Sequence, residues 1–389
     1  TLTGDSRVVV NEGGINFRGG VTGDYDLTLN GLGNLQRVVA FSSDLDIGDN
    51  DVIADNITVA FYAGNSFTGD VRINSSTLEL AAGGASTIDD NARLTMTASG
   101  RFVRLTLYQD ETIGSLAGTS GLVSAGNGNR VLTLGGDNTS TSFGGEFITG
   151  GGTLSVVKTG TGTMTLTRSY GFQNNPFLGG FTIAGGTLAI SADRVLGADS
   201  AALTFAGGGT TLQTLADITS TRNVVMNQPG TIDTAAGTTA TFGGVISGFN
   251  DLTKTGAGTL SLAGANTHNG RIYLTEGTLR IANNQALNLL GLDAFAGTTI
   301  DYADGITNAR GIQADAGLVT FNQSGGSATQ SGLIADDAAI TKTGTGNLTL
   351  SGSNTYSGTT TIAEGTLTVT SRGALGSLSA GTVVEDGAT

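Results

Sequence analysis

The stretch K-T-G-T-G-N-L-T-L at 342–350 decides the fold, because it joins a glycine turn to a short alternating strand. The chain has three lysines, and each stands in this phrase. The copies read K-T-G-T-G at 158–162, K-T-G-A-G at 254–258 and K-T-G-T-G at 342–346. Spacings of 96 and 88 residues between the lysines indicate a repeat array rather than unrelated globular domains.

Short alternating runs after each phrase predict β-strands, since β-formers alternate with small polar residues. These runs are Met164-Thr165-Leu166, Leu260-Ser261-Leu262 and Leu348-Thr349-Leu350, and a Gly-Thr-Leu strand follows at 186–188, 277–279 and 365–367. No stretch has a convincing helical period, and 283–292 makes one helical turn at most. Without helices to bridge parallel strands, we interpret the chain as an all-β solenoid.

Each copy is interpreted as several coils, or rungs, of a parallel β-helix in which a rung contacts only its neighbours. Four rungs per copy give about 22–24 residues per rung and roughly 17 rungs in the chain. Apolar residues of the last copy should point inward and stack on their counterparts one copy earlier. The residues concerned are Leu348, Leu350, Ile362, Leu367 and Val369, with the counterparts Leu260, Leu262, Ile272, Leu279 and Ile281.

The composition excludes several classes of protein. Glycine takes 64 of 389 positions and proline two, so the chain is not collagen-like. A net charge of −14 argues against binding nucleic acid or an anionic membrane surface. Cysteine is absent, which leaves no disulfide and no thiolate metal site. No apolar run approaches the ~18 residues of a membrane helix.

The residues at 252–369 resemble the autotransporter-associated β-strand repeat, also called the passenger-associated transport repeat. The family pattern resembles L-T-K-T-G-x-G-T-L-x-L-x-G-x-N-T-Y-x-G followed by x-G-G-T-L. The copy at 340–369 matches nearly throughout, whereas the copy at 252–281 has His268 for Tyr and Glu276 for Gly. The copy at 156–190 departs after Leu166, and we expect its insertion at 168–180 to form an outward loop.

The resemblance implies a right-handed parallel β-helix that is exported through an outer membrane and displayed at the cell surface. We expect residues 1–110 to form an N-terminal solenoid section with weak repeat similarity. Residues 111–389 are expected to form the repeat section, continuous with the first. The repeat serves as a stem beneath many functions, so it is specific for architecture and poor for activity.

His268 is the only histidine, so any Ser-His-Asp site would have to use it. Its counterpart one copy later is Tyr356, which favours a turn residue over a catalytic base. The lysines could form a ligand-binding ladder, but we favour a structural corner in which the stem covers apolar surface and the ammonium stays in water. Lys254→Ala and His268→Ala should therefore cost far less stability than Leu350→Asp.

The repeat motif marks a set of structural residues. Asn138, Asn266 and Asn354 recur four residues after a core leucine and are expected to cap turns, with a glycan-contacting ladder as the alternative. The other members are the lysines and glycines of the three phrases: Lys158, Gly160, Gly162, Lys254, Gly256, Gly258, Lys342, Gly344 and Gly346.

Acidic residues offer the remaining candidate chemistry. Asp44, Asp46, Asp49 and Asp51 are weak candidates for a calcium site, although their spacing fails the EF-hand and a solvated turn is the preferred interpretation. Asp89-Asp90 and Asp336-Asp337 suggest glycosidase pairs, but adjacent residues in a strand point to opposite faces. No catalytic residue and no cofactor is predicted.

Two functions from different classes follow. The preferred one is a non-enzymatic extracellular solenoid: a stalk, fibre segment or adhesive passenger, secreted and attached to the bacterial outer membrane through a translocator outside this chain. Its partners would be a host or matrix glycan or protein receptor, or further copies stacked head to tail into filaments. The alternative is a polysaccharide-acting enzyme, a lyase or glycoside hydrolase, which would need acidic and basic residues converging from three or more rungs.

Overall fold

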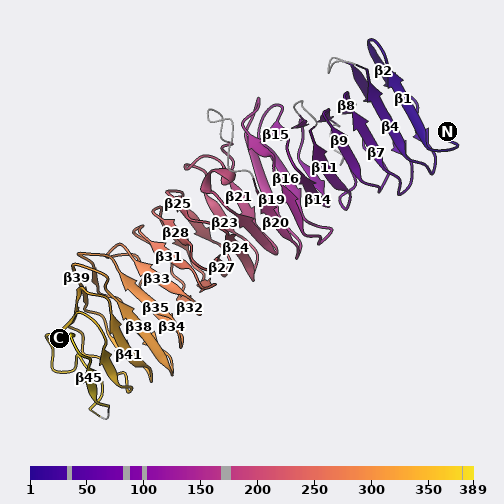
Figure 1. The fold of residues 1–389 in the computed structure, drawn as a ribbon. Coiled ribbons are helices and arrows are strands. Elements are labelled where there is room, and N and C mark those ends of the chain that lie inside the picture. Colours follow the sequence, from indigo (N-terminus) through magenta and orange to yellow (C-terminus); the bar gives the residue numbers. More distant parts are fainter. Residues whose placement is uncertain (33–36, 82–87, 99–102, 168–176, 379) are drawn as a thin grey trace. The chain divides into compact units, whose positions relative to one another are not determined.

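The computed structural model describes residues 1–32, 37–81, 88–98, 103–167, 177–378 and 380–389. It confirms an all-β parallel solenoid of about 17 turns. The chain forms two compact units, Thr1–Leu203 and Thr204–Thr389, each made of rungs whose strands lie side by side (Figure 1). In the part of the chain that is described, no helix is long and apolar enough to cross a membrane.

The first unit has three stacked parallel faces, which we call N1, N2 and N3. N1 comprises β1 (Ser6–Val10), β4 (Leu27–Gly31), β7 (Val52–Asp55), β9 (Val71–Asn74), β11 (Arg93–Thr97), β14 (Ser115–Gly118), β17 (Thr141–Phe143), β20 (Thr163–Leu166) and β22 (Thr187–Ile190). N2 comprises β2 (Gly14–Phe17), β5 (Val38–Phe41), β8 (Thr58–Phe61), β10 (Thr77–Leu80), β12 (Arg104–Leu107), β15 (Leu122–Ala125) and β18 (Glu146–Ile148). N3 comprises β13 (Glu111–Ile113), β16 (Arg130–Leu134), β19 (Leu154–Lys158) and β21 (Phe181–Ile183), and β3 (Val21–Thr22) pairs with β6 (Leu45–Asp46).

The second unit likewise has three main faces, C1, C2 and C3. C1 comprises β24 (Thr210–Thr214), β27 (Gly230–Thr234), β30 (Leu252–Thr255), β32 (Ile272–Leu274), β34 (Leu292–Ala294), β37 (Ile312–Ala314) and β40 (Ile334–Ala335). C2 comprises β25 (Ile218–Ser220), β28 (Thr239–Phe242), β31 (Thr259–Leu262), β33 (Thr278–Ile281), β35 (Thr299–Tyr302), β38 (Leu318–Asn322), β41 (Ala339–Thr343), β43 (Thr360–Ile362) and β45 (Thr382–Val384). C3 comprises β36 (Thr307–Asn308), β39 (Ser327–Gln330), β42 (Asn347–Leu350) and β44 (Thr366–Val369). In addition, β26 (Val224–Met226) pairs with β29 (Ile246–Gly248). The strand β23 (Leu203–Phe205) contains the residues at which the first unit ends and the second begins.

Inward side chains form continuous apolar columns, because successive residues of a strand point to opposite faces. One column in the second unit runs along C2 with no exposed surface, and each buried aliphatic side chain in it contributes about 2 kcal/mol. Its members are Ala240, Leu260, Leu279, Ile300 and Phe321. The alternation in the sequence therefore reports the core directly.

The inward positions predicted for the last copy are confirmed in part. Leu348, Leu350 and Ile362 are buried, as are all five of their counterparts one copy earlier. Leu367 is only half-buried and Val369 is 46% exposed, so the prediction is wrong for Val369. Both residues lie on β44, the last strand of face C3 among the described residues, where no neighbouring rung covers them.

The rungs of the second unit are shorter than predicted. Along C2 from β28 to β43, residues paired on successive strands are 19 to 21 positions apart, and only the first and last pairs of strands, β25–β28 and β43–β45, reach 22. Four rungs take the chain from Thr259 to Thr341, a distance of 82 residues. The 88-residue spacing of the lysines therefore overshoots four rungs by six residues, about one strand and its turn.

This overshoot places the last two repeat copies at different corners of the solenoid. Lys254 is on β30 of face C1 and the strand after it, β31, is on C2. Lys342 is on β41 of C2 and the strand after it, β42, is on C3. Equivalent residues of the two copies thus do not share a column, and the predicted stacking of counterparts on one another is wrong.

The short helical segment also lies elsewhere than expected. Residues 283–291 form turns and bends without helix and Leu292 begins β34, whereas a 3-10 helix spans Asp193–Leu196. The 3-10 helix begins five residues after the leucine of its Gly-Thr-Leu strand, and the segment 283–292 begins four residues after the leucine of its own. Most of the predicted loop, residues 168–176, lies outside the described residues.

Candidate functional site

Each lysine of the repeat is buried in a corner where one strand turns into the next. Its Nζ donates to three backbone carbonyls, two in its own Thr-Gly turn and one in the next rung. For Lys254 these are Thr255 O at 2.7 Å, Gly256 O at 2.6 Å and Glu276 O at 3.2 Å. Lys342 repeats the arrangement with Thr343, Gly344 and Glu364, and Lys158 repeats it with Thr159, Gly160 and Gly185. An ammonium has three donors, so this lysine clamp uses all of them.

The clamp overturns the expectation of a water-exposed ammonium. Lys158 is 1% exposed, and Lys254 and Lys342 are fully buried, because carbonyls from two rungs converge where water was expected. Burial lowers the pKa of all three lysines and brings that of Lys254 to about 8, against the opposing charges of Asp233 and Glu276. A lysine whose donors are all engaged cannot contact a ligand, so the ligand-binding alternative does not fit this geometry.

The two glycine positions of each phrase require glycine for different structural reasons. The first adopts positive φ, 64° at Gly160, 74° at Gly256 and 79° at Gly344, which other residues rarely tolerate. The second leaves no room for a side chain. A Cβ on Gly162 or Gly258 would collide with the carbonyl of Thr139 or Ala235 in the preceding rung, and one on Gly346 would lie 2.8 Å from Cγ of Gln323.

Asn266 and Asn354 bind their neighbouring rungs, not their own turns. Oδ1 of Asn266 accepts from the backbone N–H of Ile246 at 2.9 Å, and its Nδ2 donates to Ala286 O at 2.7 Å. Asn354 makes the same pair of bonds with Ile334 and Ala374. Each amide thus ties three successive rungs together and is buried, which leaves it no surface for a glycan.

Asn138 departs from that pattern. Its backbone has φ 61°, and its Nδ2 donates to Gly136 O in its own turn at 3.3 Å. Its Oδ1 accepts from the backbone of Thr161, one rung on, at 2.9 Å. Asn138 therefore combines the predicted turn cap with a bond to one neighbouring rung.

His268 is buried and its contacts specify a neutral ring. Oδ1 of Asn288 accepts from the backbone N–H groups of Leu290 and Gly291, so its Nδ2 is the atom 2.7 Å from His268 Nε2. Nε2 must therefore accept, which places the ring proton on Nδ1, an atom that has no partner among the described residues. Burial lowers the pKa of His268 to about 4, with Asp251 opposing the shift.

The equivalent position of the repeat has an aromatic side chain without a titratable ring nitrogen in the other two copies. Tyr356 is fully buried and its hydroxyl bonds Thr360 Oγ1 at 2.7 Å. In the first copy, Phe177 packs 5.5 Å from Phe181, centroid to centroid, and lies against Gly197. His268 thus fills a position that takes Tyr or Phe elsewhere, which fits its interpretation as a turn residue.

The four carboxylates of 44–51 are not brought together. Asp44 accepts from Ser66 at 2.8 Å, and Asp51 pairs with Arg72 at 2.8 Å and accepts from the backbone of Asp70 at 3.0 Å. Asp46 lies 3.4 Å from the backbone nitrogen of Gly48. Among the described residues, no group of three or more His, Cys, Asp or Glu side chains could hold a metal ion.

A buried polar network in the second unit escaped the sequence analysis. The Tyr302 hydroxyl and Asn308 Nδ2 both donate to Gln330 Oε1, at 3.0 and 2.7 Å. Nε2 of Gln330 donates to the carbonyls of Arg310 and Gly332, each at 3.0 Å. The sequence does contain a sign of this network. Asn308 and Gln330 are polar residues in the inward column of C3, in which the next strand, β42, has Leu350.

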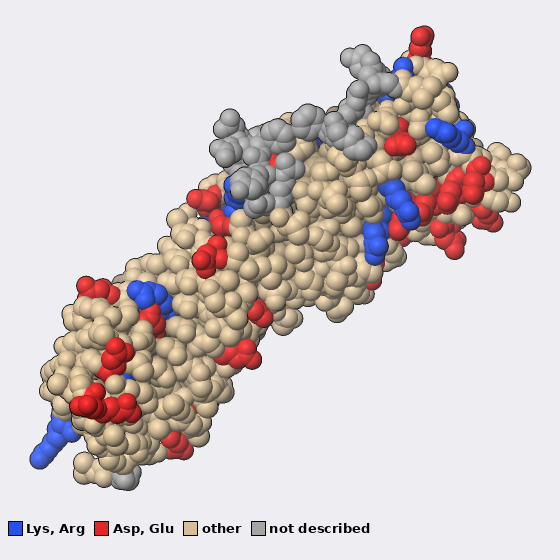
Figure 2. All heavy atoms as spheres, in the orientation of Figure 1, with Lys and Arg blue, Asp and Glu red and all other residues tan. Residues whose placement is uncertain are grey.

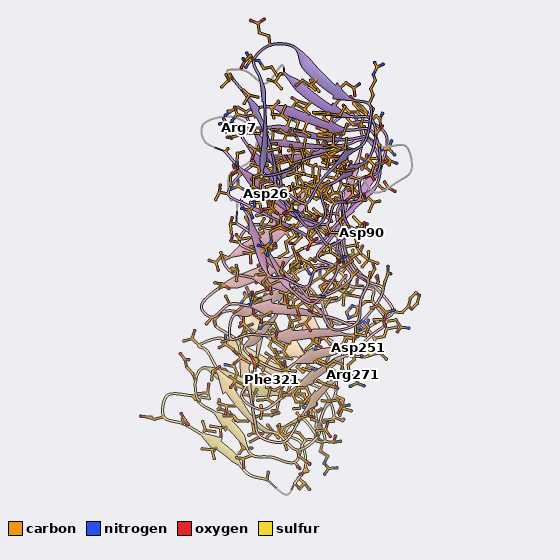
Figure 3. The ribbon with its side chains drawn as sticks, turned by 90° about the vertical axis from the view of Figure 1, so that its right-hand side faces the viewer. Arg7, Asp26, Asp90, Asp251, Arg271 and Phe321 are labelled. Atoms are coloured by element: carbon orange, nitrogen blue, oxygen red, sulfur yellow. The ribbon has the colours of Figure 1, made fainter. Side chains whose placement is uncertain are left out.

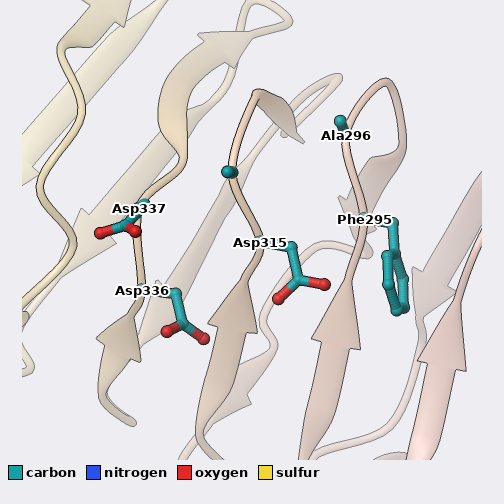
Figure 4. A pocket seen from close by; sticks show the side chains of 6 residues that line it. Phe295, Ala296, Asp315, Asp336 and Asp337 are labelled. Carbon is teal, nitrogen blue, oxygen red and sulfur yellow. The ribbon is translucent and has the colours of Figure 1, made fainter.

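A hollow of about 530 Å³ opens at the corner between C1 and C2, on the three rungs that contain β34, β37 and β40 (Figure 4). It is lined by Phe295, Ala296, Asp315, Ala316, Asp336 and Asp337. Asp336 and Asp337 both line it, contrary to the expectation of opposite faces, because they lie in the turn after β40, where Asp336 has φ 77°. Burial, then Asp336 and Asp293, raise the pKa of Asp315.

Charges are sparse on the face drawn in Figure 2, where most surface atoms belong to uncharged residues. In the second unit, several charges are paired. The Arg271 guanidinium pairs with Asp293, while the backbone N–H of Arg271 donates to Asp251 Oδ1 at 2.7 Å, so Asp251 and Arg271 lie close together (Figure 3). Arg280 likewise pairs with Asp301 on face C2.

Comparison with known proteins finds similarity in the repeat segments. The family model Passenger-associated-transport-repeat matches residues 156–190, 252–281 and 340–369. Over 205 residues, 48% of its length, the chain is 33% identical to the Adhesin BmaC autotransporter of Brucella suis biovar 1 (strain 1330). It covers only 5% of that protein. No solved structure matches the chain. The three lysine clamps thus lie in the three segments of the chain that match the passenger-associated transport repeat.

Proposed function

We propose that the chain is part of an autotransporter passenger that acts as a non-enzymatic, adhesive stem at a bacterial cell surface. The observation that carries the proposal is the burial of the repeat's own residues. The clamp lysines, the bridging asparagines and the ring at 268 or 356 all hold rungs together. The repeat therefore supplies architecture, and contact with a partner falls to the outer faces.

The adhesive part of the proposal is supported by the relative, which is named as an adhesin and an autotransporter. By the same reasoning, an outer-membrane translocator outside this chain would export it, and the location would be extracellular or surface-attached. A host or matrix glycan or protein would be the receptor. Head-to-tail stacking into filaments belongs to the same proposal, and electron microscopy of concentrated protein tests it.

The main test uses cells that produce the full-length protein. Antibodies against residues 1–389 should label intact cells, and an in-frame deletion of complete rungs from the second unit should reduce adhesion to matrix-coated surfaces. Absence of labelling on intact cells that contain the protein would contradict surface display. Full adhesion after the deletion, with display unchanged, would contradict the adhesive role of this unit.

The second candidate function, a polysaccharide-acting enzyme, is favoured by one observation. Asp315, whose pKa is raised, lies beside Asp336 in the hollow, and glycoside hydrolases pair a protonated with an ionised carboxyl group. Among the residues that the structure describes, no Lys, Arg or His lines this hollow, so the convergence of acidic and basic groups expected of such an enzyme is missing there. Release of reducing ends or unsaturated products from polysaccharides, abolished by Asp315→Asn, would favour the enzyme.

A further inference from the structure

Face C2 presents an unbroken outward column of threonines, which we call the threonine ladder. It comprises Thr239, Thr259, Thr278, Thr299, Thr320, Thr341 and Thr361, paired strand to strand over seven successive rungs. Adjacent hydroxyls are therefore about 4.8 Å apart along the column. The members come from different positions of the repeat, so only the stacking of rungs aligns them.

The ladder's hydroxyls are not used by the fold. Within the described residues, none of the seven Oγ1 atoms has a hydrogen-bond partner in the protein, and each residue is half-buried or exposed. The neighbouring outward column is engaged instead. Arg280 pairs with Asp301, Asn322 Nδ2 donates to Asp301 at 2.6 Å, and Thr343 Oγ1 donates to Asn322 at 3.1 Å.

The hollow lies beside the ladder on the same rungs. Phe295, Ala316 and Asp337 each precede a ladder threonine by four residues, at 299, 320 and 341. One side of the ladder therefore has a partly exposed aromatic ring and carboxylates, and the other side has a neutralised ion pair. The combination is a row of neutral donors and acceptors next to an apolar ring and carboxylate acceptors.

We infer that the ladder and the hollow together bind an extended neutral polysaccharide. Sugar hydroxyls pair with threonine hydroxyls as donor or acceptor, the carboxylates accept further sugar hydroxyls, and Phe295 offers an apolar ring to a sugar face. A repeating ligand suits a repeating row, because many weak contacts add along its length. The net charge of −14 and the lack of a cation on the ladder disfavour anionic polymers.

This inference deepens the adhesive role proposed above and rests on it. The test measures binding of purified chain to insoluble cellulose and chitin and to soluble dextran, with heparin and polylysine as charged comparisons. Thr278→Val, Thr299→Val and Thr320→Val together keep shape and strand preference but remove three hydroxyls. We expect at least tenfold weaker binding to the neutral polysaccharide, and little change in wild-type binding between 50 and 500 mM salt.

The matched control is Thr211→Val, Thr231→Val and Thr253→Val, an outward column on face C1 away from the hollow. It should leave binding unchanged. The triple Ser variant at 278, 299 and 320 keeps the hydroxyls and should also bind, so a loss through misfolding is recognised. Phe295→Ala should weaken binding without changing the melting temperature.

Three results would overturn the inference: no binding to any neutral polysaccharide, equal loss in the control triple, or binding to polylysine alone that disappears in salt. The last would assign the hollow to a cationic peptide. If cells adhere through this unit while the purified chain binds no neutral polysaccharide, the inference fails and the adhesive role stands. If intact cells do not display the chain, the proposed function itself fails.

Discussion

At the residue scale, the lysine clamp changes what a single substitution should cost. Removing the ammonium takes this donor from three partly buried carbonyls, and each such loss costs about 1 kcal/mol. Lys254→Met, which keeps the apolar stem, should therefore lower the free energy of unfolding by about 3 kcal/mol, measured by denaturant titration. Arg7→Met, at an exposed position on β1, is the control and should change it by less than about 0.5 kcal/mol. If Lys254→Met changes the free energy of unfolding as little as Arg7→Met does, the clamp does not stabilise the fold.

His268 predicts an acid-sensitive corner in the second unit. Its folded pKa of about 4 lies below the unfolded value near 6.5, so the unfolded chain binds more protons between these pH values. Stability is complete at pH 7 and falls as the pH drops from 6.5 toward 4, by about 2 kcal/mol at pH 4.5. His268→Tyr, the residue found at position 356, should remove this part of the loss.

The measurement is the free energy of unfolding of both proteins at pH 7 and pH 4.5. Carboxylates titrate in both proteins, so only the difference between wild type and variant reports His268. Identical losses in the two proteins would mean that the ring is not buried as a neutral group.

At the element scale, stability depends on the inward column of each strand. Leu350 on β42 is 1% exposed and packs between β39 and β44. Leu350→Asp places a charge without a partner in this core and should cost about 4 kcal/mol or more. Leu289→Asp, at a turn position 75% exposed, is the matched control and should cost less than about 1 kcal/mol. Melting temperatures of the two variants check the prediction, and equal shifts would contradict the assignment of β42 to the core.

We therefore expect substitution of Lys254 to cost an amount of stability closer to that of Leu350 than to that of a surface residue. The sequence predicted a small loss of stability for Lys254→Ala, since a lysine before a glycine turn is ordinarily at the surface. The converging carbonyls of Glu276 and the Thr255-Gly256 turn reverse that expectation.

At the scale of the whole molecule, a solenoid should not unfold as one cooperative block. Rungs contact only their neighbours, so damage stays local. Hydrogen exchange of Leu350→Asp should show lost protection in β39, β42 and β44, while β4 and β7 of the first unit keep theirs. Leu94→Asp, in the core of the first unit, should give the converse pattern. Uniform loss across both units in either variant would contradict independent, nearest-neighbour stability.

The sequence by itself determined the class of fold and most of the core. The alternation at 348–350 and 260–262 predicts buried leucines, and the Thr-Gly-x-Gly phrase predicts sharp turns, because both signals are local and set by strand pleat and glycine geometry. The recurrence of the lysines determined that the chain is a repeat array. These features need no knowledge of which rung lies next to which.

The tertiary structure alone decided what happens between rungs. Three carbonyls meet at Lys254 because turns about 20 residues apart lie on top of one another, and no local pattern reveals that convergence. The six-residue overshoot of the lysine spacing moves the last copy to another corner, which separates equivalent residues and aligns unlike ones. The threonine ladder shows this alignment of unlike residues. Thr259 and Thr341 occupy different positions in the repeat, yet the stacking of rungs places them in one column.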